Sequence, residues 1–375
     1  MKPTCRVTFL PHDKTIEVEA GQKLIRAAMA AGVHINASCG GEGVCAKCRV
    51  KIESGQVAEG LSDRLGSADV AKGYRLACRA RLVEDVTVRI PVESEVDASV
   101  LNRLSTPRRT ARIQEFDFET LKKEGWFFPP LEKVYLELPP PDAQDHLPDI
   151  TRLVSHLTMA HKEHRLEVDL SVIRKAPTVF REKDFRVTAT LARPVRRDGK
   201  SRIINVEAGD TAATNLAIAI DIGTTTVYGQ LIDLVSGEVL TQYGQFNGQI
   251  SYGEDVITRI VYAEKADGLT TLHDKIIETI NAIIARIVRR AGIATDSISS
   301  ITLAGNTTMT QLFLKIDPRY IRRAPYVPAA TLFPPVRAAE LGLELAEHAT
   351  ALVYPAVSSY VGGDIVAGVM GSAMY

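Results

Sequence analysis

Four of the five cysteines in this 375-residue chain follow a spacing that suits metal binding. Cys39, Cys45 and Cys48 lie in one glycine-rich stretch, and Cys78 follows after 29 intervening residues. Four thiolates, three of them in a single loop, suit a [2Fe–2S] cluster. A structural zinc site is one alternative, although zinc favours two paired CxxC units and Cys78 has no neighbour in sequence. Reduced core cysteines are the other alternative, and that is what we expect of Cys5.

A second stretch that could do chemistry is residues 217–228, which read AIAIDIGTTTVY. Apolar residues predict a short buried strand, and a strand–turn–strand of this kind can offer N–H groups and hydroxyls to a phosphate. The residues placed to do so are Gly223, Thr224, Thr225 and Thr226. Asp221, at the strand end, is placed to hold Mg²⁺ or its water. A polar hairpin after a core strand is the alternative, and the stretch is not a Walker A loop.

Two further glycine-containing turns follow apolar stretches later in the chain. The first comprises Gly305, Asn306, Thr307 and Thr308, and the second comprises Gly362, Gly363 and Asp364. An open sheet collects ligands at the carboxyl ends of its strands, so the three turns are expected to form one site. Asp364 is then placed to serve the metal together with Asp221.

Composition narrows the classes of function. Hydrophobic residues make up 45% and charged residues 24%, which are values typical of globular proteins. Lys+Arg and Asp+Glu balance at 45 each, so no overall field recruits nucleic acid or an anionic membrane. No signal-like segment begins the chain and no apolar run approaches the ~20 residues of a membrane span. We therefore expect a soluble, cytoplasmic protein of several domains.

The hydrophobic patterns predict an α+β and α/β multidomain chain in four parts. The expected parts are an N-terminal domain (1–91), a linker (92–125), a small α+β middle domain (126–215) and a C-terminal domain (216–375). In the middle domain, short helices are expected at 150–159 and 171–175. In the C-terminal domain, helices are expected at 256–263 and 272–291, the second closed by Gly292.

Several polar residues outside these motifs have ordinary explanations. His156, His161 and His164 have no cysteine or carboxylate pattern to complete a metal site, so exposed helix-end positions are expected. Glu254 and Asp255 precede the helix expected at 256–263. They either favour the start of that helix or reach toward the phosphate turns, and both interpretations stay open.

The cysteine loop and the RLACR sequence around Cys78 resemble [2Fe–2S] ferredoxins, which implies a β-grasp domain. Five residues separate Cys39 from Cys45, as in the adrenodoxin-like branch, where plant-type ferredoxins have four. The turn after Asp221 resembles the first phosphate motif of the superfamily containing actin, the sugar and acetate kinases and the heat-shock chaperone ATPases. That resemblance implies the first lobe of a ribonuclease H-like ATPase domain.

Longer segments resemble one family, the reductive activators of corrinoid proteins, and together they cover essentially the whole chain. They are FNGQISYGEDVITRI (246–260), AGNTTMTQLF (304–313), APYVP (324–328), SYVGGDIVAG (359–368), ELPPPDAQD (137–145) and VEAGDT (206–211). The resemblance implies a cluster on the four cysteines and an ATP·Mg²⁺ cleft formed by Asp221 and the three turns. It also implies that an electron passes from the cluster to Co(II), regenerating Co(I) in the corrinoid protein of a methyltransferase system.

The family also implies a low-potential electron donor, and a homodimer remains open. Family members continue well past residue 375, so the second lobe, with the glycine pair that holds adenosine, is expected to be missing here. That expectation places ATP binding by these residues alone in question. The alternative function is a ferredoxin-type carrier or redox sensor whose C-terminal domain serves another low-potential acceptor or only binds a partner.

Overall fold

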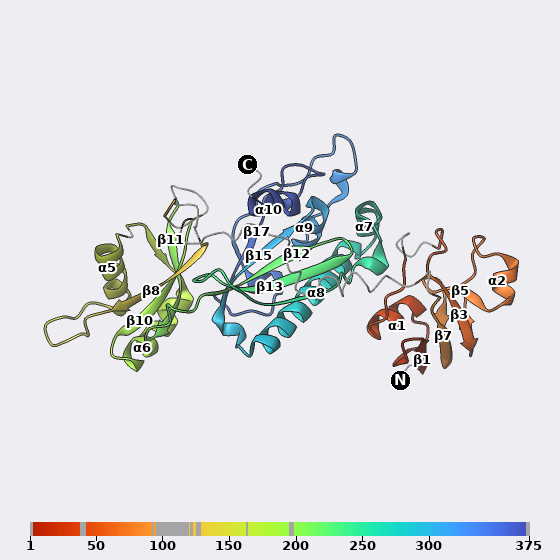
Figure 1. Ribbon diagram of the computed structural model, residues 1–375, viewed down its shortest axis with the longest axis horizontal. Coiled ribbons are helices and arrows are strands. Elements are labelled where there is room, and N and C mark those ends of the chain that lie inside the picture. The colour runs from red at the N-terminus through yellow and green to blue at the C-terminus, as the bar shows by residue number, and fades with distance from the viewer. Residues whose placement is uncertain are drawn as a thin grey trace.

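The computed structural model shows its three larger sheets in a row, with the six-stranded C-terminal sheet between the N-terminal and middle domains (Figure 1). The described residues are 3–37, 43–91, 94, 120, 123–124, 129–162, 164–194 and 199–372. Cys39 and most of the expected linker therefore lie outside them. No helix in the described part of the chain is long and apolar enough to cross a bilayer.

The N-terminal domain is a five-stranded mixed sheet with strand order β2-β1-β7-β3-β5. Its helix α1 packs Leu24, Ile25 and Ala28 into the core, because these residues recur at helical spacing. The strands are β1 (Thr4–Leu10), β2 (Lys14–Glu19), β3 (Arg49–Ser54), β4 (Val57–Ala58), β5 (Tyr74–Leu76), β6 (Arg81–Leu82) and β7 (Val86–Arg89), and the helices are α1 (Leu24–Ala30) and α2 (Ser67–Ala71). Cys5 is 2% exposed in β1, as expected of a core residue.

The middle domain is a four-stranded sheet, ordered β8-β10-β11-β9, with two helices packed on it. Its elements are β8 (Leu131–Glu137), α5 (Asp149–His161), β9 (Leu166–Val168), α6 (Leu170–Glu182), β10 (Arg186–Ala192) and β11 (Ser201–Ala208). The expectation of a helix ending at residue 175 was wrong, since α6 continues through Pro177. Val172, Ala176 and Phe180 are all fully buried four residues apart, and their packing outweighs the cost of a proline inside the helix.

The C-terminal domain has the sheet order β14-β13-β12-β15-β17-β16. The strands are β12 (Leu216–Ile222), β13 (Thr226–Asp233), β14 (Val239–Phe246), β15 (Ile298–Gly305), β16 (Val336–Arg337) and β17 (Thr350–Val353). Strands β12, β15 and β17 are parallel, while β13 is antiparallel to both of its neighbours. The carboxyl ends of β12, β14, β15 and β17 therefore meet at one edge of the sheet, as the expected fold requires.

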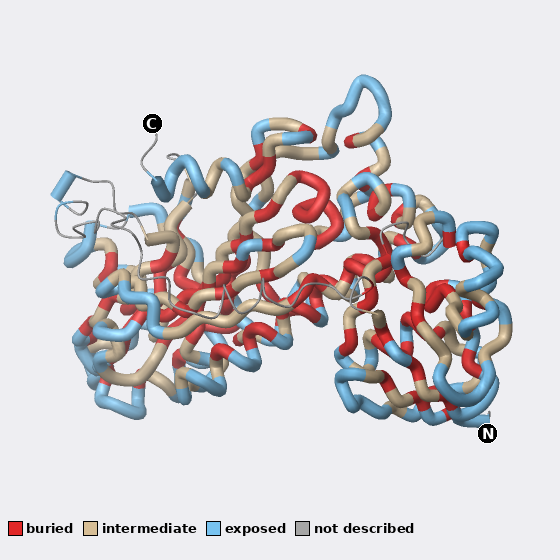
Figure 2. Tube along the Cα trace, turned by 45° about the vertical axis from the view of Figure 1, so that its right-hand side comes forward, coloured by how far each residue is buried: buried red, intermediate tan, exposed pale blue. Residues whose placement is uncertain are grey.

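Helices cover this sheet and close its core. They are α7 (Val256–Ala263), α8 (Gly268–Ala291), α9 (Thr307–Phe313) and α10 (Gly363–Gly371), with the 3-10 helices η2 (Ile250–Tyr252), η3 (Thr295–Ser297), η4 (Arg319–Ile321) and η5 (Ala338–Leu341). Helix α8 buries a stripe that includes Leu272, Ile276, Ile280 and Ile287, and it ends at the left-handed Gly292 as predicted. Buried residues run through the centre of each domain (Figure 2), which confirms the mixed α/β multidomain organisation.

Candidate functional site: a cysteine centre and three interlocked turns

The cysteine centre lies where β3 begins and β5 ends. Cys48 is fully buried and directly precedes β3, while Cys78 is 1% exposed and follows β5. A hydrogen bond between their side chains is the main cause of a raised Cys48 pKa, and burial adds to it. Cys45 is half-buried and also acts on Cys48 electrostatically. None of the described cysteines forms a disulfide.

Two adjacent thiols in an apolar core, with a third close by, form a donor set that suits iron–sulfur ligation. Among the described residues, no three His, Cys, Asp or Glu side chains are close enough to hold one ion. The fourth predicted ligand, Cys39, lies outside the described residues. His161 and His164 are exposed, as expected, whereas His156 is half-buried inside α5 and not at its end.

The first phosphate turn joins β12 to β13. Strand β12 extends through Ile222, so Asp221 lies within the strand and pairs with Tyr228 on one side and Ala304 on the other. Asn247, which follows β14, donates from Nδ2 to the carbonyl oxygen of Gly223 at 2.9 Å. The backbone N–H of Asn247 also donates to the Thr225 carbonyl at 2.9 Å, so Asn247 fixes the turn through two hydrogen bonds.

The second turn packs directly against the first. Asn306 caps α9 by accepting from the Met309 N–H, and its Nδ2 donates to Thr224 Oγ1 at 3.2 Å. Thr307 and Thr308 are almost fully buried at the start of α9, and the Thr307 hydroxyl donates to the Ser358 carbonyl at 2.6 Å. The Thr307 side chain therefore ties the second turn to the third, leaving the backbone to line the site.

The third turn closes against the second through Gly362. A Cβ built on Gly362 would lie 2.4 Å from Asn306 Cα and 2.6 Å from both the Gly305 oxygen and the Thr307 nitrogen. Only glycine permits this approach, because each of those atoms belongs to the backbone. Gly363 then begins α10 with Asp364 in its first turn.

The two predicted carboxylates influence each other across this edge. Asp221 keeps much of its surface open, yet partial removal from water raises its pKa, and the Asp364 carboxylate raises it further. Two carboxylates that repel each other beside three glycine-containing turns form an arrangement that a divalent cation would stabilise. The structure thus brings Asp221, Asp364 and the three predicted turns to one place.

Sequence reasoning missed the residues that support the turns. Arg259 in α7 is fully buried and donates to the Thr224 carbonyl, the Gly253 carbonyl at 2.8 Å and Gln249 Oε1 at 3.0 Å. Asn247 and Gln249 are also fully buried. The sequence feature that could have indicated these supporting residues is the polar Asn-Gly-Gln run after β14, since the end of β14 lies at the same sheet edge as the turns.

Glu254 and Asp255, which either favour the start of α7 or reach toward the phosphate turns, have different roles in the structure. Asp255 is the N-cap of α7 and forms a capping box with Thr258. Glu254 instead pairs with Lys47 of the cysteine loop at 3.1 Å. His34 and Phe246 also meet across the two domains, with ring centroids 5.1 Å apart.

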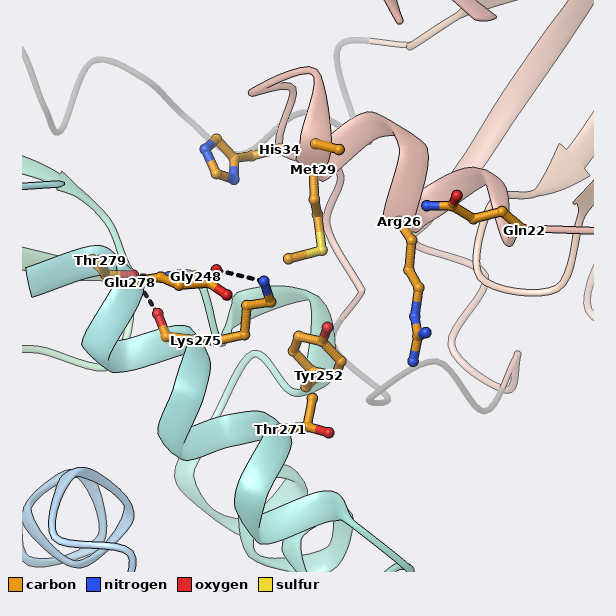
Figure 3. A pocket seen from close by; sticks show the side chains of 11 residues that line it. Gln22, Arg26, Met29, His34, Gly248, Tyr252, Thr271, Lys275, Glu278 and Thr279 are labelled. Carbon is orange, nitrogen blue, oxygen red and sulfur yellow. Dashed lines mark hydrogen bonds and ion pairs between the residues drawn. The ribbon is translucent and has the colours of Figure 1, made fainter. Parts of the chain in front are cut away.

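A cavity of about 470 Å³ lies between the two domains (Figure 3). Gln22, Arg26 and Met29 line it from the N-terminal domain, and Tyr252 and Lys275 line it from the C-terminal domain. Lys275 is paired with Glu278 within α8. The cysteine domain is therefore adjacent to the segment that supports the phosphate turns, and Met29 packs against the C-terminal core at this contact.

In sequence, the chain runs from a ferredoxin-like domain with clustered cysteines, through a middle domain, to a C-terminal domain with three interlocked turns. This combination defines a class of multidomain iron–sulfur protein. Comparisons with known proteins agree with that class. The family model described as the 2Fe-2S iron-sulfur cluster binding domain matches residues 7–83. Models of the RACo linker region and the RACo middle region match residues 120–213 and 216–375.

The chain resembles the reductive activators of corrinoid proteins over nearly all of its length. It is 26% identical over 98% of its residues to the corrinoid activation enzyme RamQ of Eubacterium limosum, covering 55% of that protein. A solved reductive activator for a corrinoid, iron-sulfur protein is 34% identical over 98% of this chain, with a TM-score of 0.61 and 58% of that structure covered. The chain thus spans a little over half the length of these relatives.

The N-terminal region also has relatives of its own. One component of the Na(+)-translocating NADH-quinone reductase of Pseudoalteromonas atlantica is 31% identical over 83 residues, which is 22% of this chain and 20% of that protein. The expected resemblances to a [2Fe–2S] ferredoxin domain and to the corrinoid activators are both confirmed.

Proposed function

We propose that this protein reductively activates a corrinoid protein, delivering one electron to Co(II) to regenerate Co(I) in an ATP-dependent manner. The observation that carries the proposal is the pairing, in one chain, of a cluster-binding domain with a lobe whose three turns interlock around Asp221 and Asp364. The similarity to corrinoid activators over 98% of the chain supports the choice of substrate.

Each part of the chain has a distinct task in this proposal. Cys39, Cys45, Cys48 and Cys78 hold the cluster, which supplies one-electron redox chemistry near roughly −400 mV if it behaves as a plant-type centre. The backbone and hydroxyls of the turn after Asp221 bind phosphate, and Asp221 and Asp364 hold Mg²⁺. Electron transfer to cobalt is uphill from such a potential, so the lobe couples nucleotide binding to differential affinity for states of the corrinoid partner.

The test is anaerobic visible spectroscopy of a Co(II) corrinoid protein mixed with this protein and a low-potential reductant. We expect the Co(I) band to form only when Mg·ATP is present. Formation of Co(I) at the same rate without nucleotide would contradict ATP coupling, and its absence despite normal cluster reduction would favour the carrier or sensor alternative. Whether this chain requires further sequence for activity is answered by repeating the test with a longer chain.

A matched pair of cysteine variants separates cobalt reduction from binding of the corrinoid partner. Cys45→Ser should abolish cobalt reduction while leaving the corrinoid partner bound, because Cys45 lies in the cluster loop. Cys5→Ser makes the same chemical change in β1, away from that loop, and should leave the iron content and reduction unchanged. Loss of partner binding in Cys45→Ser would contradict this division of labour.

A further inference from the structure

Two successive carbonyl groups of the first phosphate turn are held from the same side. Asn247 Nδ2 donates to the Gly223 carbonyl at 2.9 Å, and Arg259 Nη2 donates to the Thr224 carbonyl. Both donors come from the segment that runs from the end of β14 into α7, which has no phosphate-binding motif of its own. This segment, residues 247–259, is called the support segment below.

Fixing a carbonyl fixes the N–H of the following residue, because a planar trans peptide points its C=O and N–H in opposite directions. With the Gly223 and Thr224 carbonyls turned toward the support segment, the N–H groups of Thr224 and Thr225 point away from it. Neither N–H donates to any acceptor among the described residues. Two successive free N–H groups on one side of a turn form an anion-binding concavity.

The positive charge of Arg259 also favours an anionic ligand at this turn. Its guanidinium is fully buried and donates to four neighbours, all uncharged: the Thr224 and Gly253 carbonyls, Gln249 Oε1 and Met309 Sδ. Burial lowers its pKa to about 9, which still leaves it protonated at neutral pH. Asp255, the carboxylate that acts on it electrostatically, is engaged as the cap of α7.

We propose that Asn247 and Arg259 are positioning residues of the phosphate site, which turn the N–H groups of Thr224 and Thr225 toward a nucleotide phosphate. The buried Arg259 charge adds attraction for that polyanion. This inference rests on the proposed nucleotide binding, and it assigns a role to residues that contact the turn but not the ligand. Arg259 also contacts Met309 in α9, so one side chain braces the first and second turns together.

The direct test is amide hydrogen exchange on the intact, cluster-loaded protein, with and without Mg²⁺ and the non-hydrolysable analogue AMP-PNP, after calorimetry has established binding. Binding should slow exchange in a peptide spanning residues 222–227, where the Thr224 and Thr225 amides lie. Binding without added protection there overturns the inference. Absence of any nucleotide binding overturns the proposed function itself, so the two failures are distinguishable.

Variants test the geometry. Arg259→Lys keeps the charge but loses the guanidinium fork, and it should weaken AMP-PNP binding about 10- to 100-fold, as expected for one charge-assisted hydrogen bond. Arg289→Lys makes the same change at an exposed position of α8 and should bind as the wild type does. Unchanged affinity of Arg259→Lys, with only a lowered melting temperature, would mean a purely structural role.

Asn247→Ala provides an independent variant if Arg259→Lys does not fold. It removes the donor to the Gly223 carbonyl and should weaken AMP-PNP binding at least tenfold through the freed Thr224 peptide. It should also raise exchange of the 222–227 peptide in the ligand-free protein. Wild-type affinity in a folded Asn247→Ala variant would contradict the proposal.

Discussion

Replacing Gly362 by alanine should separate the second and third turns. The added Cβ would lie 2.4 Å from Asn306 Cα and 2.6 Å from the Gly305 oxygen, whereas ordinary contacts at a Cβ are 3.4–4 Å. Both obstacles are backbone, so relief requires the two turns to part by about 1 Å, and overpacking of this kind costs about 1–3 kcal/mol. The backbone conformation at 362 (φ −91°, ψ −175°) suits alanine, so the penalty is steric alone.

Gly368→Ala is the matched control, because it makes the same change within α10 where a Cβ meets nothing within 4 Å. It should stabilise the protein by about 0.5–1 kcal/mol through helix propensity. Calorimetric melting should show Gly362→Ala lower than the wild type by roughly 2–12 °C and Gly368→Ala slightly higher. Equal melting temperatures and equal nucleotide affinity for Gly362→Ala and the wild type would refute the interlocking of the turns.

Three further predictions follow from the electrostatics. Burial lowers the His348 pKa to about 4, so the folded state holds the neutral imidazole. Urea titrations should show the wild type losing about 3 kcal/mol of unfolding free energy, relative to His348→Gln, as pH falls from about 7 to 4. Above about pH 7 the free-energy difference between the two proteins should not change with pH. Asp364→Asn removes the charge that raises the Asp221 pKa, so the pH midpoint of Mg²⁺ binding, measured by calorimetry, should move toward acid, and an unmoved midpoint would contradict their coupling. Lys47→Glu replaces an attraction by a repulsion, so the radius of gyration measured by small-angle scattering at low salt should increase. Adding Glu254→Lys should restore the wild-type radius. A radius that neither change affects would show that this pair does not hold the domains together.

Local patterns predicted much of this fold. Helix α7 has the bounds expected from its sequence, and α8 ends at Gly292 because a left-handed C-terminal residue favours glycine. The glycine-containing turns were recognisable because each follows an apolar stretch, and parallel strands bring the ends of such stretches together. These features depend on neighbours in sequence, which a single chain displays directly.

The supports of the site depend on neighbours in space, and these were not foreseen. Arg259 is typical of the polar side of an amphipathic helix, yet tertiary packing places it in the core beneath Thr224. The extension of α6 past Pro177 was missed for the same reason, since its buried face outweighs the local rule. The strand β9 (Leu166–Val168) was also missed, because three residues carry too little pattern.

The cavity between the cysteine domain and the C-terminal domain has a consequence for how an electron carrier exchanges partners. A hollow of about 470 Å³ lined by Arg26 and Tyr252 occupies part of this interface, where a continuous apolar contact would fix two domains permanently. Among the described residues, the contacts across it include the packing of Met29 against the C-terminal core, the His34–Phe246 aromatic pair and the exposed Lys47–Glu254 pair, which is worth at most about 1 kcal/mol. In the proposed function the cysteine domain faces first an electron donor and then an acceptor, and a partly hollow interface favours that exchange of partners.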